Sequence, residues 1–246
     1  MPAPRFIRPL AAGFALLVGG WMSAADQPSH ADHVKGPFKT GPEVTRACLA
    51  CHEEHAKDFM KTVHWTWSAP QTRNGKAVDL GKKNAINNFC LALPSNEPRC
   101  TSCHAGYGWK DASFDFSQAE QVDCLVCHDT TGTYQKIPTG AGAPVLKDME
   151  WPKGSGKTLK AVDLAFVAQR VGKTSRTTCG SCHFYGGGGD HVKHGDLDSS
   201  LARPSRSRDV HMAVEGADMG CTDCHQSQNH QIPGKALSVS MSGGGQ

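Results

Sequence analysis

The chain has 246 residues, of which 26 are Lys or Arg and 23 are Asp or Glu. This near balance of charge, without a basic stripe, gives no support for nucleic-acid binding. Only 38% of the residues are hydrophobic and 27 are glycine, which argues against a large aliphatic core and predicts that something other than side chains fills the interior.

Residues 1–25 have the pattern of a secretory signal peptide. Arg5 and Arg8 precede an apolar run from Leu10 to Met22, which is shorter than the about 20 residues that span a bilayer. The alternative is a retained N-terminal anchor. No second apolar stretch follows, so we expect an exported protein of the periplasm or the extracellular space, with no membrane span after cleavage.

The next two segments in chain order differ in their expected structure. Residues 26–42 are rich in Pro and Gly and predict an extended arm. Residues 41–67, "GPEVTRACLACHEEHAKDFMKTVHWTW", predict a helix over most of their length, with Pro42 in its first turn.

Further along the chain, residues 132–157 predict a loop. Residues 158–173, "TLKAVDLAFVAQRVGK", predict the clearest helix, with Gly172 as its C-cap. No segment shows convincing strand alternation, and residues 237–246 predict a flexible tail. The expected fold is therefore mainly α and loop-rich, with little or no sheet, and its single domain covers residues 26–236.

Five copies of the pattern C-x-x-C-H occur along the chain, and this is the c-type haem attachment motif. The two thiols form thioethers to the haem and the histidine becomes the proximal iron ligand. The predicted attachment residues and proximal ligands are Cys48, Cys51 and His52; Cys100, Cys103 and His104; Cys124, Cys127 and His128; Cys179, Cys182 and His183; and Cys221, Cys224 and His225.

Zinc knuckles and disulfides are the competing interpretations of paired cysteines. Neither requires a histidine after every second cysteine, so the pattern favours five covalent haems. These five haems would supply the apolar interior that the composition lacks. Their propionates would make the loaded protein negative, which favours redox partner proteins with basic patches. Because only 24 residues separate Cys100 from Cys124, we expect those two haems to be close neighbours.

Each haem iron has a second axial position, which a side chain can close or a substrate can use. Eight histidines lie outside the motifs. His30 and His55 look spare, and the candidate distal ligands are His33, His64, His194, His211 and His230.

Two further residues fall outside this pattern. Cys90 is the one cysteine of eleven that belongs to no motif, and it is either a buried thiol or a reactive one. Lys193 follows four consecutive glycines in "FYGGGGDHVKHGDLD", residues 184–198. A lysine binds iron only when a desolvated site lowers its pKa, and the alternative is a solvated surface charge.

The sequence resembles the octahaem tetrathionate reductase family of multihaem cytochromes. The resemblance rests on "GPEVTRACLACH", "HWTW", "GKKNAINNFC", "RCTSCHAGYGWKD", "VDCLVCHDTTGTY", "CGSCHFYGGGGD", "KHGDLDSSL" and "NHQI", and it covers roughly residues 31–232. The resemblance implies a catalytic haem on the second motif, with a lysine ligand and a nearby cysteine. Here these would be Lys193 and Cys90. The family has eight haems and a long C-terminal portion, whereas this chain has five motifs.

Two functions follow from these observations. The first is a periplasmic pentahaem electron carrier that passes electrons along its haems, alone or as a subunit of a larger redox complex. The alternative is a reductase of a small oxyanion or related substrate (tetrathionate, nitrite or hydroxylamine), with its active site at the haem on the second motif.

Overall fold

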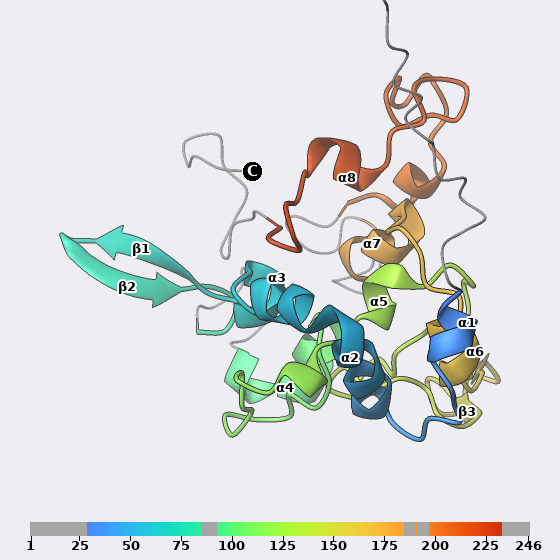
Figure 1. The fold of residues 1–246 in the computed structure, drawn as a ribbon. Helices are drawn as coiled ribbons and strands as arrows, with labels where there is room; N and C mark the ends of the chain where they lie inside the picture. Colours follow the sequence, from blue (N-terminus) through green and yellow to red (C-terminus); the bar gives the residue numbers. More distant parts are fainter. Residues whose placement is uncertain (1–28, 85–92, 185–189, 191–196, 233–246) are drawn as a thin grey trace, which may run out of the picture.

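The computed structural model describes residues 29–84, 93–184, 190 and 197–232. Helices, turns and irregular segments make up most of this part (Figure 1). Its α-helices are α1 (His30–His33), α2 (Gly41–Phe59), α3 (Val63–Thr66), α4 (Glu97–Cys100), α5 (Leu125–His128), α6 (Leu164–Ala168), α7 (Arg176–His183) and α8 (Cys221–Cys224). Its 3₁₀ turns are η2 (Leu93–Ser95), η3 (Thr101–Cys103), η4 (Ala119–Gln121) and η5 (Ser199–Ala202).

The predicted helix over residues 41–67 is confirmed as α2 followed by α3. The hydroxyl of Thr40 caps α2 by accepting a hydrogen bond from the amide of Glu43, and Pro42 lies in the first turn. The backbone departs from helical geometry at His52, the last residue of the first motif. The helix therefore carries the whole first motif and bends where its histidine lies.

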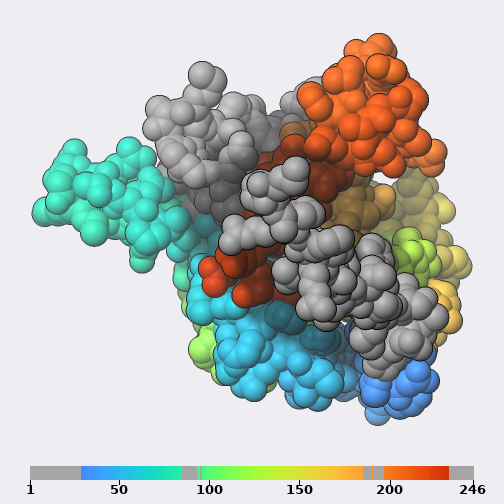
Figure 2. Space-filling view, turned by 45° about the horizontal axis from the view of Figure 1, so that its top comes forward, coloured from blue at the N-terminus to red at the C-terminus, as the bar shows by residue number. Residues whose placement is uncertain are grey.

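The prediction of little or no sheet is correct for the bulk of the chain but missed two small sheets. Strands β1 (Ala69–Arg73) and β2 (Lys76–Leu80) form an antiparallel hairpin that projects from the body (Figures 1 and 2). Asn74 and Gly75, at its tip, both have positive φ. The Asn-Gly pair is the usual signal for such a tight turn, and it could have been found in the sequence.

The predicted helix over residues 158–173 is shorter than expected. The first two residues of the predicted helix form strand β4 (Thr158–Leu159), which pairs with β3 (Met149–Glu150). Asp163 then caps α6 by accepting a hydrogen bond from the amide of Phe166. The helix ends five residues later at Ala168, so Gly172 is not its C-cap. The predicted arm also contains one helical turn, α1.

Three small clusters of buried apolar side chains form the core. The first joins α2, α5 and α6 through Val44, Leu125 and Val167. The second lies around Trp65 and Val126, and the third around Trp67 and Trp109. No helix within the described residues has the length and apolar composition needed to cross a membrane. The core is thus divided among short elements that carry the motifs.

Candidate haem-binding sites

Each of the five motifs lies on or beside a short helical segment. The first is within α2, the second spans α4 and η3, the third and fourth are on α5 and α7, and the fifth is on α8. All ten motif cysteines are free thiols. Within the described residues no three His, Cys, Asp or Glu side chains converge on a common metal position.

The motifs contact one another through their cysteines. The thiols of Cys48 and Cys124, of Cys103 and Cys182, and of Cys179 and Cys221 lie close enough to shift each other's pKa. These pairs connect the first motif with the third, the second with the fourth, and the fourth with the fifth. The neighbouring thiol of Cys182 is the main cause that lowers the pKa of Cys103 to about 5, and Lys82 and Lys136 lower it further.

Three motif histidines each lie near a histidine from elsewhere in the chain. The ring centroids of His52 and His30 are 6.2 Å apart, those of His183 and His64 6.2 Å, and those of His128 and His230 5.8 Å. Two imidazoles on opposite sides of one metal, each bonded at about 2 Å, have centroids about 6 Å apart. All three pairs therefore have the spacing of two axial ligands.

These pairs bear on the predicted distal ligands. His64 and His230 lie opposite motif histidines, and His30, which looked spare in the sequence, lies beside His52. His33 is exposed on α1, and His211 is exposed beside Asp209; their predicted role stays a prediction. Cys90, Lys193 and His194 lie outside the described residues.

His55 contacts two of these pairs without fitting between the members of either. Its ring centroid is 5.3 Å from that of His52 and 4.6 Å from that of His230. Both separations are shorter than two axial ligands of one metal require. The prediction that His55 is spare is consistent with this arrangement.

His128 has the hydrogen bonding typical of a metal ligand. Its Nδ1 bonds to the carbonyl oxygen of Gly172 at 2.7 Å, and metal-binding histidines usually use one ring nitrogen in this way while the other binds the metal. Gly172, which the sequence suggested as a helix cap, therefore orients a histidine instead.

His104 of the second motif differs from the other motif histidines because protein encloses it. Its side chain is fully buried, and its Nε2 bonds to the carbonyl oxygen of Trp65 at 2.8 Å. Its Nδ1 is buried without a partner. Burial lowers the pKa of His104 to about 3, so the ring is neutral. The aromatic rings around it are those of Trp65, Trp67, Trp109, Phe114 and Phe116.

A buried polar network lies between the second and third motifs. Asp123, directly before Cys124, accepts hydrogen bonds from the hydroxyls of Tyr107 and Tyr134, each at 2.8 Å. Lys136 forms an ion pair with Asp123 at 3.0 Å and donates to the carbonyl oxygen of His104 at 2.6 Å. Burial raises the pKa of both tyrosines, so both hydroxyls stay protonated and can donate. Sequence reasoning did not find this network.

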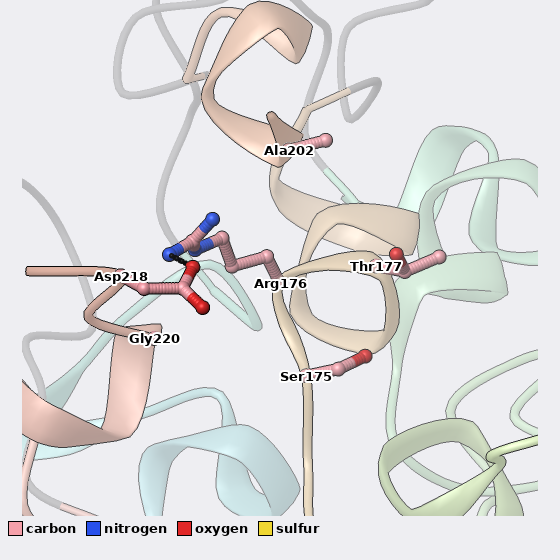
Figure 3. A pocket seen from close by; sticks show the side chains of 6 residues that line it. All are labelled: Ser175, Arg176, Thr177, Ala202, Asp218 and Gly220. Carbon is pink, nitrogen blue, oxygen red and sulfur yellow. Dashed lines mark hydrogen bonds and ion pairs between the residues drawn. The ribbon is translucent and has the colours of Figure 1, made fainter. Parts of the chain in front are cut away.

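Arg176 links the fourth and fifth motifs. Its guanidinium donates to the carbonyl oxygen of Met219 and to the carboxylate of Asp218, just before the fifth motif (Figure 3). Arg176 and Asp218 line a pocket of about 310 Å³, and Figure 3 shows the arginine side chain reaching toward Asp218. Arg176 thus joins the residues just before the fifth motif to α7.

The residues present fit covalently bound haems. The motif thiols are free, three of the five motif histidines lie near another histidine at the spacing of two axial ligands, and Nδ1 of His64 is buried without a partner. Burial, aided by His183, lowers the pKa of His64 to about 4, which keeps this imidazole in the neutral form that binds metals.

Comparisons with known proteins agree with this geometry. The family described as cytochrome c554 and c-prime matches residues 47–129. An octahaem cytochrome c from Shewanella oneidensis is 56% identical and has a TM-score of 0.73; the match covers 87% of this chain and 44% of the octahaem chain. An uncharacterized protein of Archaeoglobus fulgidus is 25% identical in an alignment of 226 positions that covers 77% of this chain and 75% of that protein.

Motifs, fold and relatives together define a multihaem c-type cytochrome of redox metabolism. More closely, over 87% of its length the chain is similar to an octahaem cytochrome c. It spans less than half the length of the octahaem chain that it matches.

Proposed function

We propose that this chain is a periplasmic electron carrier with five c-type haems, one on each motif. Bound haem would supply a one-electron couple at each iron. The observation that carries the proposal is the pairing of motif histidines with His30, His64 and His230 at the spacing of two axial ligands. Irons closed on both sides exchange electrons without binding substrate.

The contacts between motifs support a carrier rather than five separate sites. Through the three cysteine pairs, each motif touches at least one other. Lys136 and Asp123 also connect the second motif with the third, the pair that the sequence spacing predicted to be neighbours. Haems on motifs in contact would lie close enough for electrons to pass between them.

The redox partners of this carrier would be proteins with basic patches, because the haem propionates add negative charge. Their association should weaken as salt concentration rises. We also propose export through residues 1–25. This carrier would act alone or as a subunit of a larger redox complex.

The test is to produce the chain in a host that attaches c-type haem and to count haems on each motif by peptide mass. The electron paramagnetic resonance spectrum of the oxidised protein then reports the spin state of each iron. His64→Ala should convert one low-spin iron to high spin, whereas the matched variant His55→Ala should change none. Fewer than five haems, or low-spin signals unchanged in His64→Ala, would contradict the proposal.

A second candidate function is reduction of tetrathionate, nitrite or hydroxylamine at the second motif. The observation that favours it is the unusual His104, whose Nε2 already bonds to Trp65. An iron at this motif would meet a different ligand arrangement from the paired histidines elsewhere. Cys90 would then bind or polarise the substrate, or form a mixed disulfide with a sulfur substrate, and Lys193 would occupy or flank the iron.

Turnover of each oxidant with a reduced dye as electron donor tests this candidate. Cys90→Ser and Lys193→Met should each lower turnover strongly while the haem count stays the same. His55→Ala, which alters no residue of the second motif, is the control. Unchanged turnover in Cys90→Ser would remove this cysteine from the mechanism.

A further inference from the structure

The buried ion pair between Asp123 and Lys136 is oriented from the third motif toward the second. Asp123 directly precedes Cys124, and its carboxylate accepts a hydrogen bond from the amide of Val126, inside the third motif, at 3.1 Å. The ammonium of Lys136 donates at 2.6 Å to the carbonyl oxygen of His104, the last residue of the second motif. The negative end therefore lies against the third motif and the positive end against the second.

Both charges are shielded from solvent. The side chain of Asp123 has no exposed surface and that of Lys136 is 9% exposed. Charges in such a site act more strongly on their surroundings than surface charges do, because water does not screen them. The hydroxyls of Tyr107 and Tyr134 also donate hydrogen bonds to the carboxylate of Asp123, so two dipoles direct their positive ends at it.

We infer that this ion pair biases electron sharing between the haems of the second and third motifs, so that the electron is favoured at the second. The inference rests on the proposed attachment of haems to these two motifs. In the step concerned, a ferrous iron at the third motif loses one electron and a ferric iron at the second motif gains it. No bond forms or breaks and no proton is transferred.

The direction follows from the sign of each charge. A positive charge stabilises the reduced state of a nearby iron, because reduction adds an electron there. A negative charge destabilises it. Lys136 thus raises the reduction potential at the second motif, and Asp123 lowers the potential at the third. Both effects favour electron transfer from the third motif to the second.

The test is a redox titration of the haem-loaded protein, followed by absorbance and electron paramagnetic resonance. The double variant Asp123→Asn/Lys136→Met replaces the ion pair by neutral side chains of similar size. We expect the equilibrium constant for electron sharing between the two haems to fall by about three- to tenfold, as charges acting through an effective dielectric constant of about 20 would give. A tenfold fall corresponds to 59 mV for one electron.

The control is Asp148→Asn/Lys160→Met, which makes the same change of charge in an exposed ion pair. It should leave both potentials unchanged. Titrations of Cys100→Ala/Cys103→Ala and of Cys124→Ala/Cys127→Ala assign each potential to its motif.

A third variant, Tyr134→Phe, changes the field in the opposite direction and keeps both charges. Without this hydroxyl, less positive charge offsets the negative charge of the Asp123 carboxylate. The reduction potential at the third motif should therefore fall in Tyr134→Phe, whereas it should rise in the double variant. This variant also tests the inference if the double variant does not fold.

The outcomes separate the inference from the proposed function. If peptide masses show no haem on the second or third motif, the proposed function fails. If both motifs carry haem and neither the double variant nor Tyr134→Phe moves their potentials relative to the control, the ion pair does not bias electron sharing.

Discussion

The second and first motifs have the same five-residue pattern, yet their histidines have different surroundings. His104 of the second motif is fully buried among aromatic rings, whereas His52 of the first lies exposed on α2. Protein side chains enclose the histidine of the second motif. The first motif offers an open face, which a haem would cover. The pattern thus marks where a haem attaches, and the surrounding segments decide how far protein already encloses it.

The enclosed part of the molecule should be the most sensitive to single substitutions. Lys136→Met leaves the carboxylate of Asp123 buried without its cation. Breaking a buried ion pair from one side costs about 3–5 kcal/mol, so the free energy of unfolding of the haem-loaded protein should fall by that amount in urea titrations.

The matched control is Lys160→Met, which breaks the exposed pair with Asp148. Exposed pairs contribute about 0–1 kcal/mol. If the free energy of unfolding falls by the same small amount in both variants, the network between the second and third motifs does not stabilise the fold. The enclosed and exposed motifs would then not differ in this respect.

An intermediate effect is expected where the exposed first motif joins the enclosed part. Thr45 of α2 is buried and its hydroxyl donates to the carbonyl oxygen of Val122 at 2.7 Å. Thr45→Val removes that donor and costs about 1–3 kcal/mol for the buried carbonyl left unpaired. Thr72→Val, on the exposed hairpin, should stay within about 0.5 kcal/mol of the wild type. Equal midpoints in urea for the two variants would show that this hydrogen bond does not hold α2.

Local patterns predicted the helix that carries the first motif, and long-range contacts account for much of what they missed. The helix over residues 41–67 followed from its own cap and proline. The cage around His104 brings Trp65 together with Trp109, which are far apart in the sequence, and no local pattern shows that meeting. The same is true of Lys136 and Asp123, and of His30, which looked spare in the sequence and lies near His52. The Asn-Gly turn was a local signal that could have been used.

The smallest effect on stability is expected at Arg176, which binds the residues just before the fifth motif. Its guanidinium donates twice to the carbonyl oxygen of Met219 and once to Asp218. Lysine keeps the charge but cannot reproduce this planar set of donors. Because Asp218 is 60% exposed, Arg176→Lys should cost only about 1 kcal/mol or less. The substitution should instead increase local opening around the fifth motif. Amide hydrogen exchange at residues 218–225 should therefore be faster in Arg176→Lys than in the control variant Arg73→Lys on the hairpin. Unchanged exchange there would mean that the fifth motif does not depend on this arginine.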